Sequence, residues 1–101
     1  MTEKEKMLAG LLYDANNDRN LIKERLVCKD KIFNYNRLRP SDLMFRKTLL
    51  LEILGKTGEN FIIEQPFYCD YGYNISVGEN FYSNFNLVIL DEATVTIGDN
   101  V

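Results

Sequence analysis

The chain has 101 residues, of which 46% are hydrophobic and 27% charged, and its formal net charge at pH 7 is −3. This composition is typical of one small globular domain with a modest core, and it excludes a disordered chain. No apolar run approaches the ~20 residues of a membrane helix, and no signal peptide is recognisable, so we expect a cytoplasmic protein with no membrane partner.

The two halves of the chain differ in charge. All twelve Lys and Arg residues lie between Lys4 and Lys56, and residues 1–56 contain eight acidic residues, whereas residues 57–101 contain seven acidic residues and no cation. A nucleic-acid surface needs a basic stripe that neutralises phosphates. We therefore predict no nucleic-acid partner, and we interpret the charges of the first half as solvated helix faces.

The first half predicts three helices. Thr2 and Glu5 form a capping-box pattern for a short helix that Gly10 ends. Asp18 can cap a second helix, which the stretch from Asn34 to Pro40 interrupts. Its buried stripe is expected to combine two lines of residues, namely Leu21, Arg25, Cys28, Ile32 and Tyr35 with Ile22, Leu26, Lys29 and Phe33 beside them.

A third helix is predicted after Ser41 and Asp42, with Gly55 as its C-terminal stop. Its buried face is expected to comprise Leu43, Phe45, Leu49, Leu50, Ile53 and Leu54. Cys28 and Cys69 are too few for a disulfide framework or a zinc site. We expect both to be buried free thiols and predict no metal site.

The second half contains an internal repeat. A phrase of glycine, acid, asparagine and an apolar residue begins at Gly58, Gly78 and Gly98, with twenty residues between successive copies. A period near twenty with β-branched residues is typical of a β-solenoid. An antiparallel meander with Gly-Asx turns is the alternative, but a meander has no reason to repeat at a fixed spacing.

The apolar positions between the copies keep the same spacing. They predict four pairs of residues in neighbouring coils: Phe67 with Leu87, Cys69 with Ile89, Ile75 with Val95, and Val77 with Ile97. Alternation with polar residues places such side chains on the inner face of strands. The glycine after each strand is expected to adopt positive φ at a corner, and the asparagine that follows can do the same.

Several of these phrases resemble a known family. Asp70–Ile75, Gly78–Asn86 and Thr96–Val101, together with Lys4–Gly10 and the following Tyr13, are similar to the maltose and galactoside O-acetyltransferases. The resemblance implies an α+β fold. Residues 1–57 would form a helical maltose-acetyltransferase-type domain, and residues 58–101 the first coils of a left-handed parallel β-helix of hexapeptide repeats, a truncated solenoid.

The resemblance also implies an activity. Such enzymes use acetyl-CoA as co-substrate, acetylate a hydroxyl of maltose, glucose or a galactoside, and act as homotrimers with a histidine as general base. This chain contains no histidine, and the family's base would lie beyond Val101. We therefore expect the N-terminal part of such an enzyme, inactive alone and without a bound cofactor.

Carried over residue by residue, the resemblance assigns sugar-contacting positions to Asp70, Tyr82, Asn84, Asp91 and Glu92. The family's N-terminal acceptor carboxylate falls near Tyr13–Asn16, where the register places Ala15. Carboxylates, amides and an aromatic wall suit a neutral polyol. Alternatively, Asn84 is a corner residue and Asp91 satisfies turn amides.

Two other functions remain open at this stage. The chain could be a non-catalytic assembly or sugar-binding module that docks through an open coil edge. It could also belong to an acetyltransferase with a non-sugar acceptor, since a fold does not fix its substrate. The helical N-terminal domain favours a sugar as the acceptor.

Overall fold

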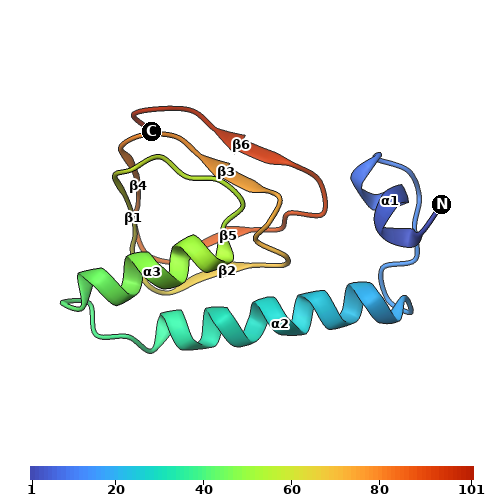
Figure 1. Ribbon diagram of the computed structural model, residues 1–101, viewed down its shortest axis with the longest axis horizontal. Helices are drawn as coiled ribbons and strands as arrows, with labels where there is room; N and C mark the ends of the chain where they lie inside the picture. Colours follow the sequence, from blue (N-terminus) through green and yellow to red (C-terminus); the bar gives the residue numbers. More distant parts are fainter.

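The computed structural model describes all 101 residues, and its helices precede its strands. In Figure 1 the strands trace two stacked triangular coils, with α2 and α3 lying along one side. This order confirms the α+β class. The elements are α1 (Glu3–Leu8), α2 (Arg19–Asn36), α3 (Leu43–Ile53), β1 (Phe61–Ile63), β2 (Phe67–Cys69), β3 (Ile75–Val77), β4 (Phe81–Ser83), β5 (Leu87–Ile89) and β6 (Val95–Ile97).

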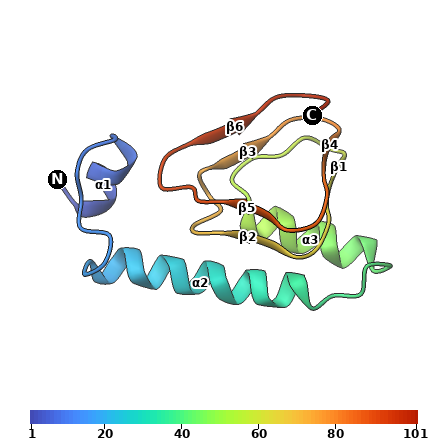
Figure 2. The same ribbon diagram turned by 180° about the vertical axis from the view of Figure 1, so that it is seen from behind.

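Each side of the triangle is a parallel pair of strands, one from each coil. β1 pairs with β4, β2 with β5, and β3 with β6. The stacking of the coils is visible from the opposite side in Figure 2. The register joins residues twenty apart and confirms the four predicted pairs, which are Phe67–Leu87, Cys69–Ile89, Ile75–Val95 and Val77–Ile97. The antiparallel alternative is therefore wrong.

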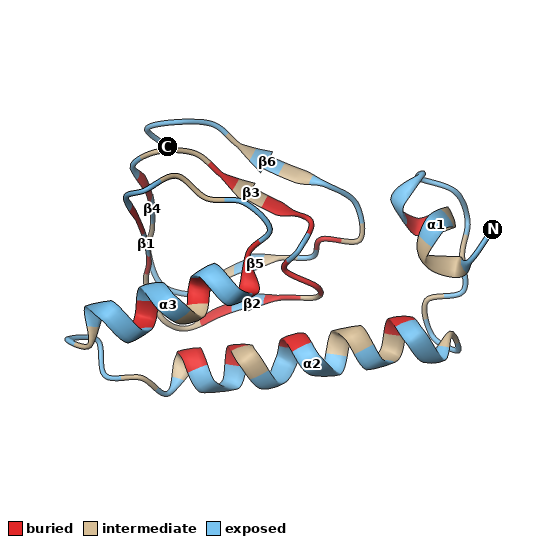
Figure 3. Cartoon of the chain, in the orientation of Figure 1, coloured by how far each residue is buried: buried red, intermediate tan, exposed pale blue.

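The first coil and the two long helices share one hydrophobic core. The inward residues of β1, β2 and β3 are buried, whereas those of β5 and β6 are only partly buried (Figure 3). The core comprises Cys28, Ile32, Tyr35, Leu50, Ile53, Leu54, Phe61, Ile63, Phe67, Cys69, Ile75, Val77 and Phe81.

The predicted helix starts are largely confirmed. Thr2 accepts a hydrogen bond from the Glu5 amide, and the Glu5 carboxylate accepts one from the Thr2 amide, each 3.0 Å long. Asp18 accepts a hydrogen bond of 2.9 Å from the Leu21 amide and caps α2. Asp42 occupies the cap position of α3, but its side chain makes no cap hydrogen bond.

Two of the predicted buried faces are wider than the real ones. On α2, the line through Leu21, Cys28, Ile32 and Tyr35 is buried, but Leu26 and Phe33 are exposed. The helix lies against one side of the coil, so only a narrow stripe of it is covered. This prediction of a broad stripe is wrong.

On α3, Leu43 and Phe45 are exposed, and Arg46 is buried instead. This helix contacts the rest of the protein through residues 46, 50 and 53, which share one face at i, i+4 and i+7. The prediction for Leu43 and Phe45 is therefore wrong.

Gly58 and Gly78 allow close stacking of the coils, and none of the three repeat glycines adopts positive φ, so that expectation is wrong. Asn80 and Asn100 adopt positive φ, at 59° and 60°, and the glycines two residues before them do not. A Cβ atom on Gly78 would lie 2.7 Å from the carbonyl carbon of Gly98 in the next coil. At Gly55 a Cβ would lie 2.9 Å from the carbonyl carbon of Tyr73, so this glycine also allows a close approach.

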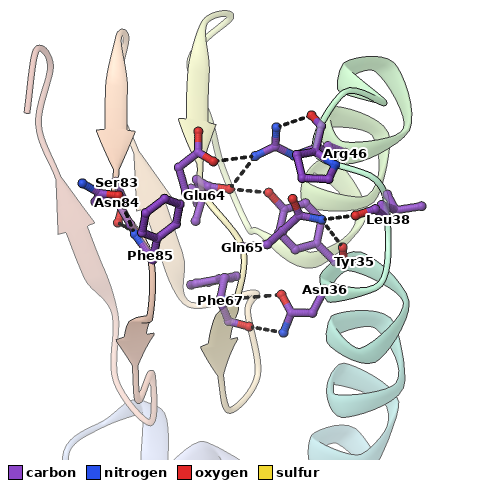
Figure 4. A network of polar contacts seen from close by, with 12 residues as sticks. Tyr35, Asn36, Leu38, Arg46, Glu64, Gln65, Phe67, Ser83, Asn84 and Phe85 are labelled. Atoms are coloured by element: carbon purple, nitrogen blue, oxygen red, sulfur yellow. Dashed lines mark hydrogen bonds and ion pairs between the residues drawn. The ribbon is translucent and has the colours of Figure 1, made fainter.

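Polar contacts fix the helices to the first coil (Figure 4). The Asn36 side-chain amide donates to the Phe67 carbonyl over 3.0 Å and accepts from the Phe67 amide over 2.9 Å. Gln65, at the corner between β1 and β2, donates to the carbonyls of Tyr35 and Leu38 at 2.9 and 2.8 Å. The helices therefore hold the coil in one fixed register. None of the three helices is long and apolar enough to cross a membrane.

Candidate functional site

The candidate site lies at one corner of the triangle. In the first coil this corner joins β2 to β3, and in the second coil it joins β5 to β6. The loop between β2 and β3 and the loop between β5 and β6 stack here, with α1 beside them in Figure 1. Met7, Leu21 and Tyr71 form a second small core, with Tyr13 packed against it. The N-terminal segment therefore covers one edge of this corner.

Asp91 is wholly buried and organises the loop below it. Its carboxylate accepts hydrogen bonds from the amides of Asp70 (3.2 Å), Tyr71 (2.9 Å) and Asn74 (3.3 Å), and its carbonyl accepts from the Asn74 side chain over 2.9 Å. Charge-assisted bonds to backbone amides are strong. Asp91 therefore satisfies backbone amides of a turn, which is the structural role that the sequence also allowed. A direct contact of Asp91 with a sugar stays a prediction.

Asp70 and Glu92 form a pair of neighbouring, partly exposed carboxyl groups at this corner. Burial, followed by hydrogen bonding with Asp70, raises the pKa of Glu92 to about 7. Two adjacent carboxyl groups resist ionising together, so one keeps its proton up to a higher pH. Near neutral pH the pair therefore offers both a hydrogen-bond donor and acceptors.

Tyr13 lies close to this acid pair, although the sequence did not place it in the site. Burial raises the pKa of Tyr13, and the negative charge of Glu92 adds to that increase. The loop that carries Tyr13 is held by Arg25, whose guanidinium donates to the Ala15 carbonyl (2.6 Å) and to the Tyr71 hydroxyl (2.7 Å). The sequence signal that could have indicated this role is the presence of an aromatic residue just after the first helix.

The chain supplies no N-terminal carboxylate to the acid pair from this loop. Ala15, at the position expected for the family's carboxylate, offers only its carbonyl to Arg25. Asp14 is exposed and accepts a hydrogen bond from the Asn17 amide over 3.2 Å. Asp14 therefore caps its own turn.

Two aromatic rings line the same corner. The centroids of Tyr71 and Tyr73 are 5.4 Å apart, and the ammonium of Lys4 lies 4.6 Å from the Tyr73 ring centroid. Lys4 also forms an ion pair with Glu24 over 2.8 Å. The corner therefore contains carboxyl groups, two aromatic rings and a lysine that is paired with a glutamate.

Tyr82 and Asn84 do not join this group within the chain. Tyr82 points outward from β4 and is exposed, and Asn84 lies at the corner between β4 and β5. The side-chain oxygen of Asn84 accepts a hydrogen bond from the Phe85 amide over 3.0 Å (Figure 4). The strand β5 separates this corner from the one that holds Asp91 and Glu92. The five predicted residues therefore fall into two groups.

Comparison with known proteins bears on both the fold and the family. Residues 6–58 match the family model described as the maltose acetyltransferase hexapeptide capping motif. The Saccharomyces cerevisiae protein YJL218W, classed by its name among the acetyltransferases, is 55% identical over 97 residues, which are 96% of this chain and 50% of that protein.

Solved structures agree with the model. A maltose O-acetyltransferase from Clostridium difficile 630 superimposes with a TM-score of 0.96 and 45% identity, over 99% of this chain and 53% of that one. A galactoside acetyltransferase in complex with coenzyme A gives a TM-score of 0.91 and 42% identity, over 99% of this chain and 50% of that one.

The stacked parallel coils with a helical cap therefore define the left-handed β-helix of the hexapeptide-repeat acetyltransferases. Within that class, the chain belongs to the maltose acetyltransferase family, whose structures include complexes with coenzyme A. The chain spans about half the length of the curated relatives that it matches.

Proposed function

We propose that this chain is the N-terminal part of an enzyme that transfers an acetyl group from acetyl-CoA to a hydroxyl of maltose, glucose or a galactoside. Residues 1–57 form its capping domain and residues 58–101 its first coils. The observation that carries the proposal is the corner at which the buried Asp91 carboxylate binds the Asp70 and Tyr71 amides, with Glu92 next to Asp91 in the chain and Tyr13 packed against the same edge. The matched family and its sugar-acetylating neighbours support it.

The corner offers a neutral polyol the contacts that it needs. Protonated Glu92 donates to an acceptor oxygen, and the Asp70 carboxylate accepts from a sugar hydroxyl. Tyr13 adds a wall for the apolar face of the ring. Asp91 acts as a positioning residue because its carboxylate holds the backbone of the loop that carries Asp70.

Tyr82 and Asn84 belong, in this proposal, to an acceptor pocket completed across subunits. Both side chains are exposed, and they lie at a different corner from Glu92. A three-fold assembly can bring different corners of neighbouring subunits together, which agrees with the homotrimer that the family resemblance implies.

The residues present here do not fit the phosphates of acetyl-CoA. Residues 57–101 contain no lysine or arginine, so the coils offer a phosphate group only Lys56, which pairs with Ser76. The chain also has no histidine. We therefore assign both donor binding and the general base to parts of the enzyme outside these residues, and the 101 residues alone are expected not to catalyse.

A chimera tests this proposal. Residues 1–101 are joined to the C-terminal part of the Clostridium difficile maltose O-acetyltransferase, which is 45% identical over the shared part. We expect the chimera to acetylate maltose from acetyl-CoA. The variant Glu92→Ala should lose roughly 10–100-fold in kcat/KM, because it removes the hydrogen-bond donor to the sugar, whereas Glu92→Gln keeps a donor at this position and should lose less.

The matched control is Glu59→Ala, because Glu59 is exposed on the coil away from the acid pair. This variant should keep the activity of the chimera. If the chimera is folded by circular dichroism but acetylates no sugar, or if Glu59→Ala and Glu92→Ala lose activity equally, the proposal is wrong. Acetylation of a non-sugar alcohol alone would favour the other acceptor class.

A further inference from the structure

Two cysteines that no part of the proposed reaction uses face each other in the core. Cys28 on α2 and Cys69 at the end of β2 are free thiols, and their sulfur atoms lie 3.6 Å apart. Both are buried, with exposed fractions of 3% and 5%. They are separated by 41 positions in the sequence, so only the fold brings them together.

The Cys69 side of the pair borders a surface hollow. Cys69 lines this hollow of about 460 Å³ between α2 and β2, together with Lys29, Phe33, Tyr68 and Leu90. A small neutral molecule such as hydrogen peroxide fits a hollow of this size. The other neighbours of the pair belong to the hydrophobic core.

The two sulfurs differ in acidity. The hydrogen bond with Cys69 lowers the pKa of Cys28, whereas the same contact, burial and the nearby acids raise the pKa of Cys69. The thiolate is the reactive form of cysteine. Because the sulfurs lie 3.6 Å apart, whichever thiol is oxidised first has the other within contact distance as its resolving thiol.

We propose that Cys28 and Cys69 are an oxidation site, at which a hydroperoxide converts the two thiols into a disulfide between α2 and β2. The thiolate of one cysteine attacks an oxygen of hydrogen peroxide, the O–O bond breaks, and a sulfenic acid forms as hydroxide leaves. The sulfur of the other cysteine, after losing its proton, attacks the sulfenic sulfur, the S–S bond forms, and water leaves. The sulfurs lose two electrons, and the peroxide is reduced to water.

The geometry favours this closure. The sulfurs must approach from 3.6 Å to the S–S bond length of about 2.05 Å, which small rotations of the two side chains provide. Because the fold already holds them in contact, the second step is intramolecular and needs no further encounter. The product links the helical segment to the first coil.

Peptide mapping of the peroxide-treated chain is the direct test. The intact mass should fall by about 2 Da, the loss of two hydrogens. Trypsin cleaves after Arg25, Lys29 and Lys56, so the disulfide should join residues 26–29 to residues 57–101. Alkylation before digestion blocks exchange between thiols. The same treatment in urea should give far less of this linked peptide.

Variants and thermal melting provide an independent readout. The oxidised chain should melt roughly 10 °C higher than the reduced chain, because the link restrains the unfolded state, and reductant should reverse the shift. Cys28→Ala and Cys69→Ala should each abolish the reversible shift, whatever their own stability. The proposal is overturned if both thiols remain free to alkylation after unfolding of the treated chain, or if the linkage is as abundant in urea as in buffer.

Discussion

The two coils repeat one strand pattern, but they differ in what covers them. In the first coil the inward residues of β1, β2 and β3 are buried beneath α2 and α3. In the second coil the equivalent residues of β5 and β6 are only half-buried. Within these 101 residues the first coil is covered by the helices and by the second coil, so equivalent positions in the repeat differ in burial according to what packs against their coil.

The corners of the second coil differ in the same way. At one corner Asp91 is fully buried against the loop between β2 and β3, and α1 covers that side. At another corner Asp99 is exposed, although it also accepts a hydrogen bond, from the Glu79 amide over 2.8 Å. The same chemical contact is expected to matter more where water is excluded.

The largest expected effect comes from this pair of aspartates. Asp91→Ala leaves three amides without their acceptor and should lower the free energy of unfolding by about 3–5 kcal/mol. Asp99→Ala should lower it by less than about 1 kcal/mol, because water replaces the lost acceptor. Urea unfolding of both variants measures the difference. Equal losses would show that the buried corner is not special, and Asp91→Asn provides a milder variant if Asp91→Ala does not fold.

The repeat glycines provide the next comparison. Gly78→Ala should destabilise the chain by about 2–3 kcal/mol, because its Cβ would lie 2.7 Å from the carbonyl carbon of Gly98 in the next coil. At Gly98 a Cβ meets nothing within 4 Å, so Gly98→Ala should change stability by less than about 0.5 kcal/mol. Thermal denaturation of the two variants tests this, and similar effects would contradict the explanation by close stacking.

A pair of valines tests how far burial decides the contribution of each coil. Val77→Ala, in the buried first coil, should cost about 2 kcal/mol through lost apolar burial and a small cavity. Val95→Ala removes the same atoms from the half-buried second coil and should cost less than about 1 kcal/mol. Chemical denaturation gives both values. If they are equal, burial does not decide the contribution of each coil.

The smallest expected effect is the pH dependence from Glu92. Burial and Asp70 raise the pKa of Glu92 from its usual 4.5 to about 7 in the folded chain, so the folded state binds this proton more tightly than the unfolded state. Stability from this group therefore falls as pH rises from 4.5 to 7 and is constant above. Because Glu92 is partly exposed, the change should be below about 1 kcal/mol.

Glu92→Gln should remove this part of the pH dependence while the melting temperature in acid changes little. Melting curves between pH 4 and pH 8 for the variant and the unchanged chain provide the measurement. A parallel decline of both curves over this range would mean that Glu92 does not keep its proton in the folded chain.

The candidate site could be predicted only in part from the sequence. The positions Asp70, Asp91 and Glu92 follow from a resemblance, and their meeting at one corner follows from the twenty-residue register. The resemblance placed the segment Tyr13–Asn16 near the acceptor, but Tyr13 itself was missed, because no local pattern shows which side chain of that loop faces the corner. The separation of Tyr82 and Asn84 from Glu92 could not be predicted, since it depends on where each coil turns.

The sequence by itself determined the repeat, the pairing of strands and the caps of α1 and α2, because all of these depend on spacing along the chain or on neighbours within a few residues. Only the tertiary structure decided which face of α3 is buried, that Gly78 permits stacking rather than positive φ, and that Cys28 meets Cys69. These features depend on which surfaces exclude water and touch, and side chains from distant segments create those surfaces together.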